Sequence, residues 1–232
     1  MRTVKKIAEG VAGWLLYEFH CMNADMFDEK YLTQPIGNIL KAKYGNRVDA
    51  EYNHPILNQG KKGRGRPPQI DLVIKDNQNQ MIAAVESKWY GDSAVSIKDI
   101  MWDLVRLEIV RHQYGIPCFF VMGGMKKRLN NLFTSKTFLE PNTKGEDRPL
   151  LTTENHGRNF FVFTNPSSKR NQLIKDKFEQ YPDLMIPEKI SVQNPSYYPR
   201  VGRNADHQVF AWEVLSNNSV PRFNARRSKI YK

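Results

Sequence analysis

Three residues in the first half of the chain have the types and spacing of a hydrolytic metal site. Asp71 lies in a run that alternates apolar and polar residues, and Glu86 and Lys88 follow the apolar run 81–85. Successive side chains of a strand point to opposite faces, so Glu86 and Lys88 project the same way. Because burying an unpaired charge is costly, two acids and a lysine on apolar strands require an explanation.

A divalent metal ion is the specific explanation of these charges. Asp71 and Glu86, with the backbone carbonyl of Ser87, would give oxygen ligands to Mg²⁺, for which Mn²⁺ can substitute. Lys88 would lie beside the attacking water, and a substrate phosphate would complete the shell. The alternative is a buried ion pair of Lys88 with Glu86 or Asp71 and no chemistry. Acid-x-Lys is a weak pattern alone, since residues 28–30 also match it, and the second acid on a paired strand favours the metal.

Asp71 followed by Glu86-Ser87-Lys88 resembles the D…ExK signature of the PD-(D/E)XK nuclease superfamily, which has the restriction-endonuclease-like fold. Ile70 stands where the family has a proline before the aspartate. The resemblance covers about residues 28–123. It implies a metal-dependent nuclease in which Asp71, Glu86 and Lys88 are catalytic, built on a core of order αβββαβ.

The elements that must position these residues follow from hydrophobic periodicity. Strands 70–75 and 81–85 form a hairpin around the polar turn 76–80. The other expected strands are 47–54, 116–122, 159–164 and 208–215. The expected helices are 3–22, 28–44, 92–114, 125–133 and 171–181.

This order predicts an α/β (α+β) fold with a mixed central sheet flanked by helices. The expected organisation is one nuclease domain over 1–232, with the αβββαβ core over about 28–123, an N-terminal helix over 3–22 and a C-terminal elaboration of strands and loops over 124–232. Pro35 is expected to kink or split the second helix. Residues 57–68 and 134–157 are expected to be loops, and residues 186–202 irregular.

Three further acids are candidates for the metal site. Glu18 and Glu29 lie on the first two helices, where either could point at the metal or be a solvated helix carboxylate. Glu51 lies on the strand expected beside that of Asp71, as a third carboxylate or an ordinary exposed residue. The expected helix 92–114 carries charges that belong on its surface, although one of them can pair with a site residue: Asp103, Arg106 and Glu108.

Composition narrows the class of protein. A formal net charge of +11 on 232 residues predicts attraction to polyanions, chiefly nucleic acid. No apolar run is long enough to span a bilayer, no secretory signal is present, and two cysteines fit a reducing cytoplasm. No P-loop or dinucleotide-binding glycine pattern occurs, so no nucleotide cofactor is expected. The loop 57–68 carries four cations, Lys61, Lys62, Arg64 and Arg66. Through them it would follow a DNA backbone or enter a minor groove; the alternative is a solvated loop without such contacts.

The expected function is a Mg²⁺-dependent endonuclease that hydrolyses phosphodiester bonds of double-stranded DNA. In the superfamily's terms, a small basic chain without a motor resembles a type II restriction endonuclease, a homodimer with a cognate DNA methyltransferase in the same system. One alternative is a repair, phage or mobile-element nuclease of the same fold that acts on branched, nicked or single-stranded DNA. The other is a non-catalytic DNA-binding protein whose acids form a structural ion pair.

Overall fold

The computed structural model describes residues 2–23, 27–60, 66–91, 96–140, 148–153, 158–193, 195–199 and 206–231. The strands are β1 (Val48–Asn53), β2 (Gln69–Lys75), β3 (Met81–Tyr90), β4 (Cys118–Met125), β5 (Asn159–Val162), β6 (Met185–Pro187), β7 (Lys189–Val192), β8 (Ser196–Tyr198), β9 (His207–Leu215) and β10 (Arg222–Asn224). The helices are α1 (Arg2–His20), α2 (Glu29–Tyr44), α3 (Leu57–Gly60), α4 (Ile97–Tyr114), α5 (Lys126–Phe133), α6 (Lys169–Gln172) and α7 (Lys175–Gln180), with 3₁₀ turns at Gly45–Arg47 and Lys229–Tyr231.

An eight-stranded mixed sheet forms the centre of the molecule, in the order β1-β2-β3-β4-β9-β7-β5, with β8 also paired to β9. β1, β2 and β3 are antiparallel neighbours, and β4 is parallel to β3 after the crossover through α4. This mixed sheet with flanking helices confirms the predicted mixed α/β class. Residues 29–125 run α2, β1, α3, β2, β3, α4 and β4, which differs from the predicted order αβββαβ by the one-turn helix α3. Among the described helices, none has the length and apolarity needed to cross a bilayer.

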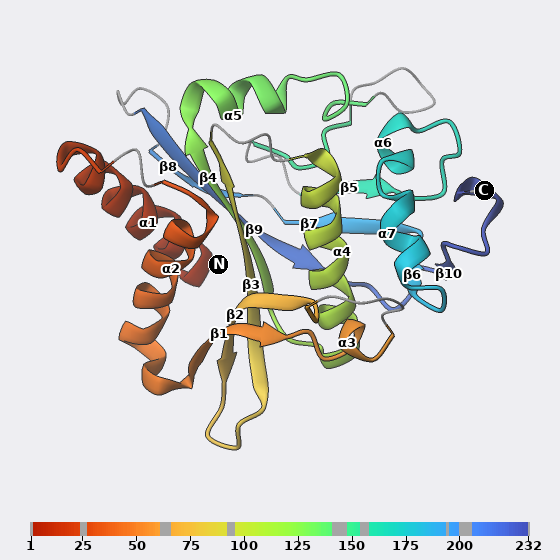
Figure 1. Ribbon diagram of the computed structural model, residues 1–232, viewed down its shortest axis with the longest axis horizontal. Helices are drawn as coiled ribbons and strands as arrows, with labels where there is room; N and C mark the ends of the chain where they lie inside the picture. The colour runs from red at the N-terminus through yellow and green to blue at the C-terminus, as the bar shows by residue number, and fades with distance from the viewer. Residues whose placement is uncertain are drawn as a thin grey trace.

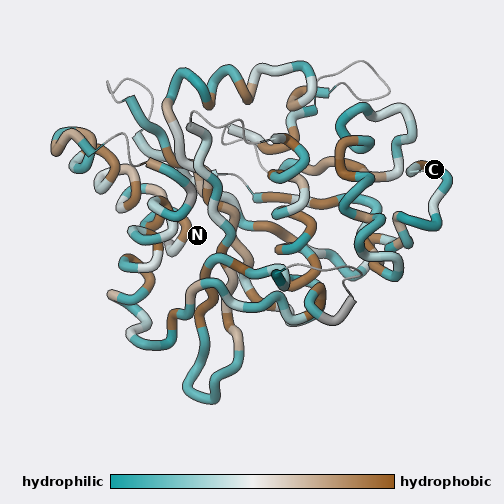
Figure 2. The backbone as a smooth tube through the Cα atoms, in the orientation of Figure 1, coloured by the Kyte–Doolittle hydropathy of each residue, from teal (hydrophilic) through white to brown (hydrophobic). Residues whose placement is uncertain are grey.

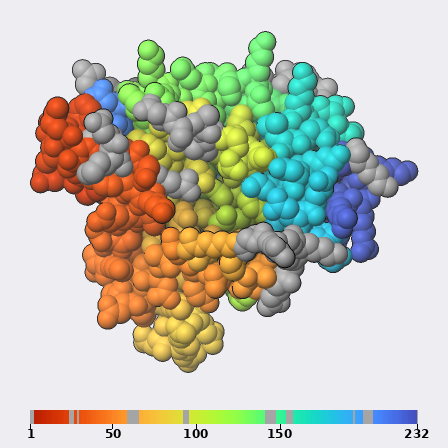
Figure 3. Space-filling view, in the orientation of Figure 1, coloured from red at the N-terminus to blue at the C-terminus, as the bar shows by residue number. Residues whose placement is uncertain are grey.

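The two faces of the sheet carry different helices (Figure 1). α1 and α2 cover one face, where Leu72, Val85 and Val121 join their apolar side chains in one cluster. α4 and the C-terminal segments cover the other face, where Val73, Ala84 and Phe120 belong to a second cluster. The polar turn between β2 and β3 projects from the body of the molecule, as Figures 2 and 3 show. Alternation along β2 and β3 thus supplies both cores.

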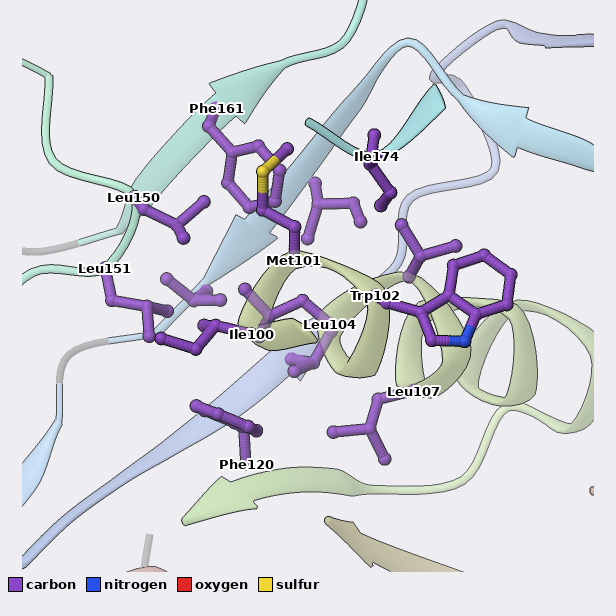
Figure 4. Close-up of a cluster of buried hydrophobic side chains, with 14 of the residues drawn as sticks. Ile100, Met101, Trp102, Leu104, Leu107, Phe120, Leu150, Leu151, Phe161 and Ile174 are labelled. Atoms are coloured by element: carbon purple, nitrogen blue, oxygen red, sulfur yellow. The ribbon is translucent and has the colours of Figure 1, made fainter. Parts of the chain in front are cut away.

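α4 is covered on both sides rather than lying on the surface. Ile100, Leu104 and Leu107 point toward Phe120 of β4, whereas Met101 lies toward Leu150, Leu151 and Phe161 of the C-terminal region (Figure 4). The expectation that its charges lie on the surface was wrong for two of them, since Asp103 and Glu108 are buried. The physical reason is that the C-terminal segments pack on what would otherwise be the solvent side of this helix.

Several element boundaries differ from the predictions for local reasons. α4 begins at Ile97, where the Ser96 side chain accepts a hydrogen bond from the amide of Asp99, and residues 92–95 lie outside the described part. α2 continues through Pro35 without splitting. β4 does not end at Gly123-Gly124 but pairs with β9 as far as Met125, because β9 supplies backbone partners along its length.

The predictions for the C-terminal half were less accurate. The segment expected to be irregular contains β7, β8 and part of β6, which were missed because prolines interrupt their short patterns. The helix expected over 171–181 is two short helices, α6 and α7. α3 also lies within the loop expected over 57–68. The strand expected over 208–215 is confirmed as β9.

At Gly124 the β3–β4 pair leaves no room for a side chain, and this leads to a stability prediction. A Cβ at Gly124 would lie 2.4 Å from the carbonyl oxygen of Tyr90, a backbone atom that cannot move aside easily. We expect Gly124→Ala to lower the free energy of unfolding by about 1–3 kcal/mol in urea denaturation. Gly13→Ala in exposed α1 meets nothing within 4 Å and should raise it by about 0.5–1 kcal/mol. Equal stabilities for the two variants would contradict the described packing.

A buried charge cluster as the candidate active site

Asp71 lies where β2 separates from β3. The pairing between these strands ends at Leu72↔Val85, whereas β2 stays paired to β1 as far as Gln69. Beyond that point the Asp71 carboxylate accepts hydrogen bonds from the Ser87 amide (2.7 Å) and the Ser87 hydroxyl (2.8 Å). The side chain thus replaces a strand acceptor and keeps the two strands joined where their backbones part.

Glu86 projects from β3 toward α4, as the alternation predicts for this face. Its side chain is 2% exposed and forms an ion pair with the Arg106 guanidinium. Arg106 also donates to the carbonyl of Gln69, and its Nη1 lies 3.5 Å from Oδ1 of Asp103. One guanidinium therefore joins β2, β3 and α4 around the acid.

Lys88 projects to the same side as Glu86, and its ion-pair partner is Asp103, one of the three α4 charges of which one was expected to pair with a site residue. Its Nζ lies 3.1 Å from Oδ2 of Asp103, and the two side chains are 11% and 6% exposed. This Asp103 oxygen is buried and has no hydrogen bond of suitable geometry. Asp103 and Arg106 are therefore part of the site. The sequence contained a signal that this part of the helix is buried. In the run 100–110, every residue apart from Asp103, Arg106 and Glu108 is apolar, on all sides of the helix, and this pattern is typical of a buried helix.

The cluster holds three carboxylates and two cations: Asp71, Glu86, Asp103, Lys88 and Arg106. Burial raises the pKa of Asp71, against the two hydrogen bonds from Ser87, and the Asp103 charge raises it further. Burial also raises the pKa of Glu86 well above its ordinary value, opposed by Arg106 and reinforced by the other two acids. Burial lowers the pKa of Arg106, but the surrounding carboxylates outweigh it and the net shift is upward. The site thus has more negative than positive formal charge and would be stabilised by a further cation.

These residues fit a hard divalent cation such as Mg²⁺. The buried ligand atoms are carboxylate oxygens, and the pKa of both Asp71 and Glu86 is raised by burial. Within the described residues, no set of three or more His, Cys, Asp or Glu side chains is placed to share an ion. Asp71 and Glu86 would therefore act as a pair, completed by water, substrate and the predicted Ser87 carbonyl.

The remaining predicted residues lie elsewhere or outside the described part. Glu51 is exposed, has φ +50° and pairs with Arg66 at 2.7 Å, although it lines the same cavity as Asp71. Glu18 accepts hydrogen bonds from Asn23 and from Tyr31, and the bond from Tyr31 joins α1 to α2. Four predicted residues have side chains outside the described residues: Glu29, Lys61, Lys62 and Arg64.

Comparisons of this chain with protein-family models, with curated proteins and with solved structures gave no match. A function must therefore be argued from the side chains. What they offer is a pair of carboxylates, a lysine held by a third acid and an arginine that neutralises one of the pair, all at the gap between two strands.

The raised pKa of Glu86 predicts how stability changes with pH in metal-free protein. The folded state holds the Glu86 proton more tightly than the unfolded state, whose pKa is near the ordinary 4.5. This contribution to the unfolding free energy is therefore fully present below about that pH and is lost as pH rises toward the folded pKa. Glu86→Gln cannot ionise, so its stability relative to wild type should increase with pH, by at most about 1.4 kcal/mol per pH unit.

Urea denaturation in EDTA at several pH values measures this difference. Glu9→Gln, at an exposed carboxylate of α1, is the control and should keep the wild-type profile. A stability difference between Glu86→Gln and wild type that does not change with pH would show that Glu86 does not titrate as its burial requires.

Proposed function

We propose that this chain is a Mg²⁺-dependent endonuclease that hydrolyses double-stranded DNA, with the restriction-endonuclease-like core of the PD-(D/E)XK superfamily. The observation that carries the proposal is the buried cluster of Asp71, Glu86 and Lys88 at the gap between β2 and β3. The αβββαβ order, apart from α3, and the parallel β3–β4 pair support it, because they are the arrangement that the motif implies.

The residues of the cluster would divide the work as follows. Asp71 and Glu86 would hold Mg²⁺, which supplies charge stabilisation at the scissile phosphate and an activated water. Ser87 fixes one Asp71 oxygen through two hydrogen bonds. Lys88 would orient the water and stabilise the negative charge that builds up on the phosphate, and Asp103 holds its ammonium group in place.

Arg106 gives the cluster a second state in the absence of metal. Its guanidinium neutralises Glu86 where a metal ion would otherwise do so. A bound cation would take over that charge, which leaves Arg106 available to pair with Asp103 or with a substrate phosphate. Each of these roles needs only a change of partner within the cluster.

The choice of DNA rests on charge, and the finer biological role on the motif. A net charge of +11 favours a polyanionic substrate. Type II restriction activity, a homodimer that cuts both strands, and a cognate DNA methyltransferase are proposed because the D…ExK signature resembles that of restriction endonucleases. A nuclease of the same fold that acts on branched or single-stranded DNA would use the same cluster.

One observation favours a second candidate, a non-catalytic DNA-binding protein. Lys88 pairs with Asp103 and Glu86 pairs with Arg106, so both charges have partners without a metal ion. Cleavage assays separate the two proposals.

Incubation of several plasmids with the protein in Mg²⁺ or in EDTA is the direct test of activity. We expect discrete fragments that require Mg²⁺ and a rate on the order of 10²–10³-fold lower in Lys88→Ala, because a charge-stabilising group is removed. Lys6→Ala, at an exposed lysine of α1, is the control and should cut like wild type.

The pattern of products distinguishes the candidates. A Mg²⁺-dependent smear or nicking would keep the nuclease and reject the site-specific restriction role. Intact plasmid in every lane, together with DNA binding that is indifferent to Mg²⁺, would reject the nuclease and favour the ion-pair protein.

A further inference from the structure

A cavity of about 630 Å³ lies between α2 and the strands β1 and β2, and Asp71 is one of its lining residues. The α2 wall contributes five polar side chains, Thr33 and the more exposed set of four polar residues Lys30, Gln34, Asn38 and Lys41. The cavity therefore opens beside the candidate active site from the face of the sheet opposite α4. No role was assigned to it from the sequence.

The four polar residues form one stripe along α2. Their spacing of four, four and three residues places them on the same side of a helix, and the run from Lys30 to Lys41 is about 16 Å long. All four are exposed, whereas Leu32, Ile36 and Leu40 bury the opposite side of α2 against the sheet. The stripe is thus not needed for packing.

Several described lysines have carboxylate partners, and the two lysines of the stripe are not among them. Lys5, Lys75, Lys98 and Lys177 each lie within 4 Å of a carboxylate. Within the described part of the chain, neither Lys30 nor Lys41 has an ion pair. Their charge therefore remains available to an external anion.

The rim of the same cavity receives the end of the predicted basic loop. Glu51 lines the cavity, and Arg66 pairs with it at 2.7 Å. Three cations thus surround a cavity that contains two carboxylates, one paired with Arg66 and the other held by Ser87. The balance of charge favours an anionic ligand of extended shape.

We propose that this cavity and the α2 stripe bind the sugar–phosphate backbone of one DNA strand and lead it to Asp71. Lys30 and Lys41 would contact phosphates, and the amides of Gln34 and Asn38 would donate to phosphate or sugar oxygens between them. The proposal deepens the nuclease function and rests on it for the direction of the strand toward Asp71.

Binding of a short labelled duplex in EDTA, followed by fluorescence anisotropy over a range of salt, tests this track. The Lys30→Ala/Lys41→Ala protein loses two phosphate contacts. Its affinity should fall on the order of 10–100-fold at 0.1 M salt, and its log–log salt slope should become shallower by about 1.8. The matched control Lys6→Ala/Lys43→Ala removes the same charge from α1 and from another side of α2, and should change both quantities little.

A second pair of variants separates contact from net charge. Gln34→Ala/Asn38→Ala should weaken binding while the salt slope stays at the wild-type value, because no charge is removed. The proposal is overturned if the control pair weakens binding as much as the stripe pair, or if the stripe pair leaves the salt slope unchanged.

Cleavage in Mg²⁺ by the same proteins tells the two proposals apart. If wild type cuts DNA and the stripe variant binds like the control, the track is wrong and the nuclease stands. If wild type does not cut but the stripe variant loses affinity as expected, the track stands as a DNA-binding surface and the nuclease is wrong.

Discussion

The charge cluster at the centre of this structure depends on the contacts of the Arg106 guanidinium. It pairs with Glu86, binds the Gln69 carbonyl and lies beside Asp103, so it compensates acids that would otherwise be buried without a counter-charge. The Arg106 carbonyl in turn accepts a hydrogen bond from one ring nitrogen of His54. The other ring nitrogen accepts a hydrogen bond from the backbone amide of Leu57. Burial and the Arg106 charge lower the pKa of His54 to about 4, which keeps this ring neutral.

The C-terminal half of the chain explains why such a cluster can be buried at all. Its segments cover α4, and Arg222 forms a two-point ion pair with the buried Glu108 at 2.9 and 3.1 Å. Water is thereby kept from the side of α4 that faces away from the sheet, and the charges on this helix must be satisfied inside the protein. The elaboration thus holds α4, and with it Asp103 and Arg106, against the candidate site.

The parts of the fold that periodicity specifies were predicted from the sequence, and the parts that depend on distant partners were not. Alternation along β2 and β3 placed Glu86 and Lys88 on one face, and the contacts of both with α4 residues confirm it. That one of the charges Asp103, Arg106 and Glu108 could pair with a site residue was predicted, but not that two of them do or with which partners, because Asp103 and Arg106 reach the site only through the crossover packing of α4. The α2 stripe was missed for the same reason, since its meaning depends on the cavity beside it.

The central claim is that this cluster is a metal site which Arg106 neutralises in metal-free protein. Crystals soaked in Mn²⁺, with anomalous diffraction recorded at the manganese edge, test it most directly. The account predicts an anomalous peak within coordination distance of the Asp71 and Glu86 carboxylates, with Arg106 moved away from Glu86. The metal-site claim would be contradicted if no peak appeared beside Asp71 and the Glu86–Arg106 pair stayed intact. The cluster would then be a structural ion-pair network.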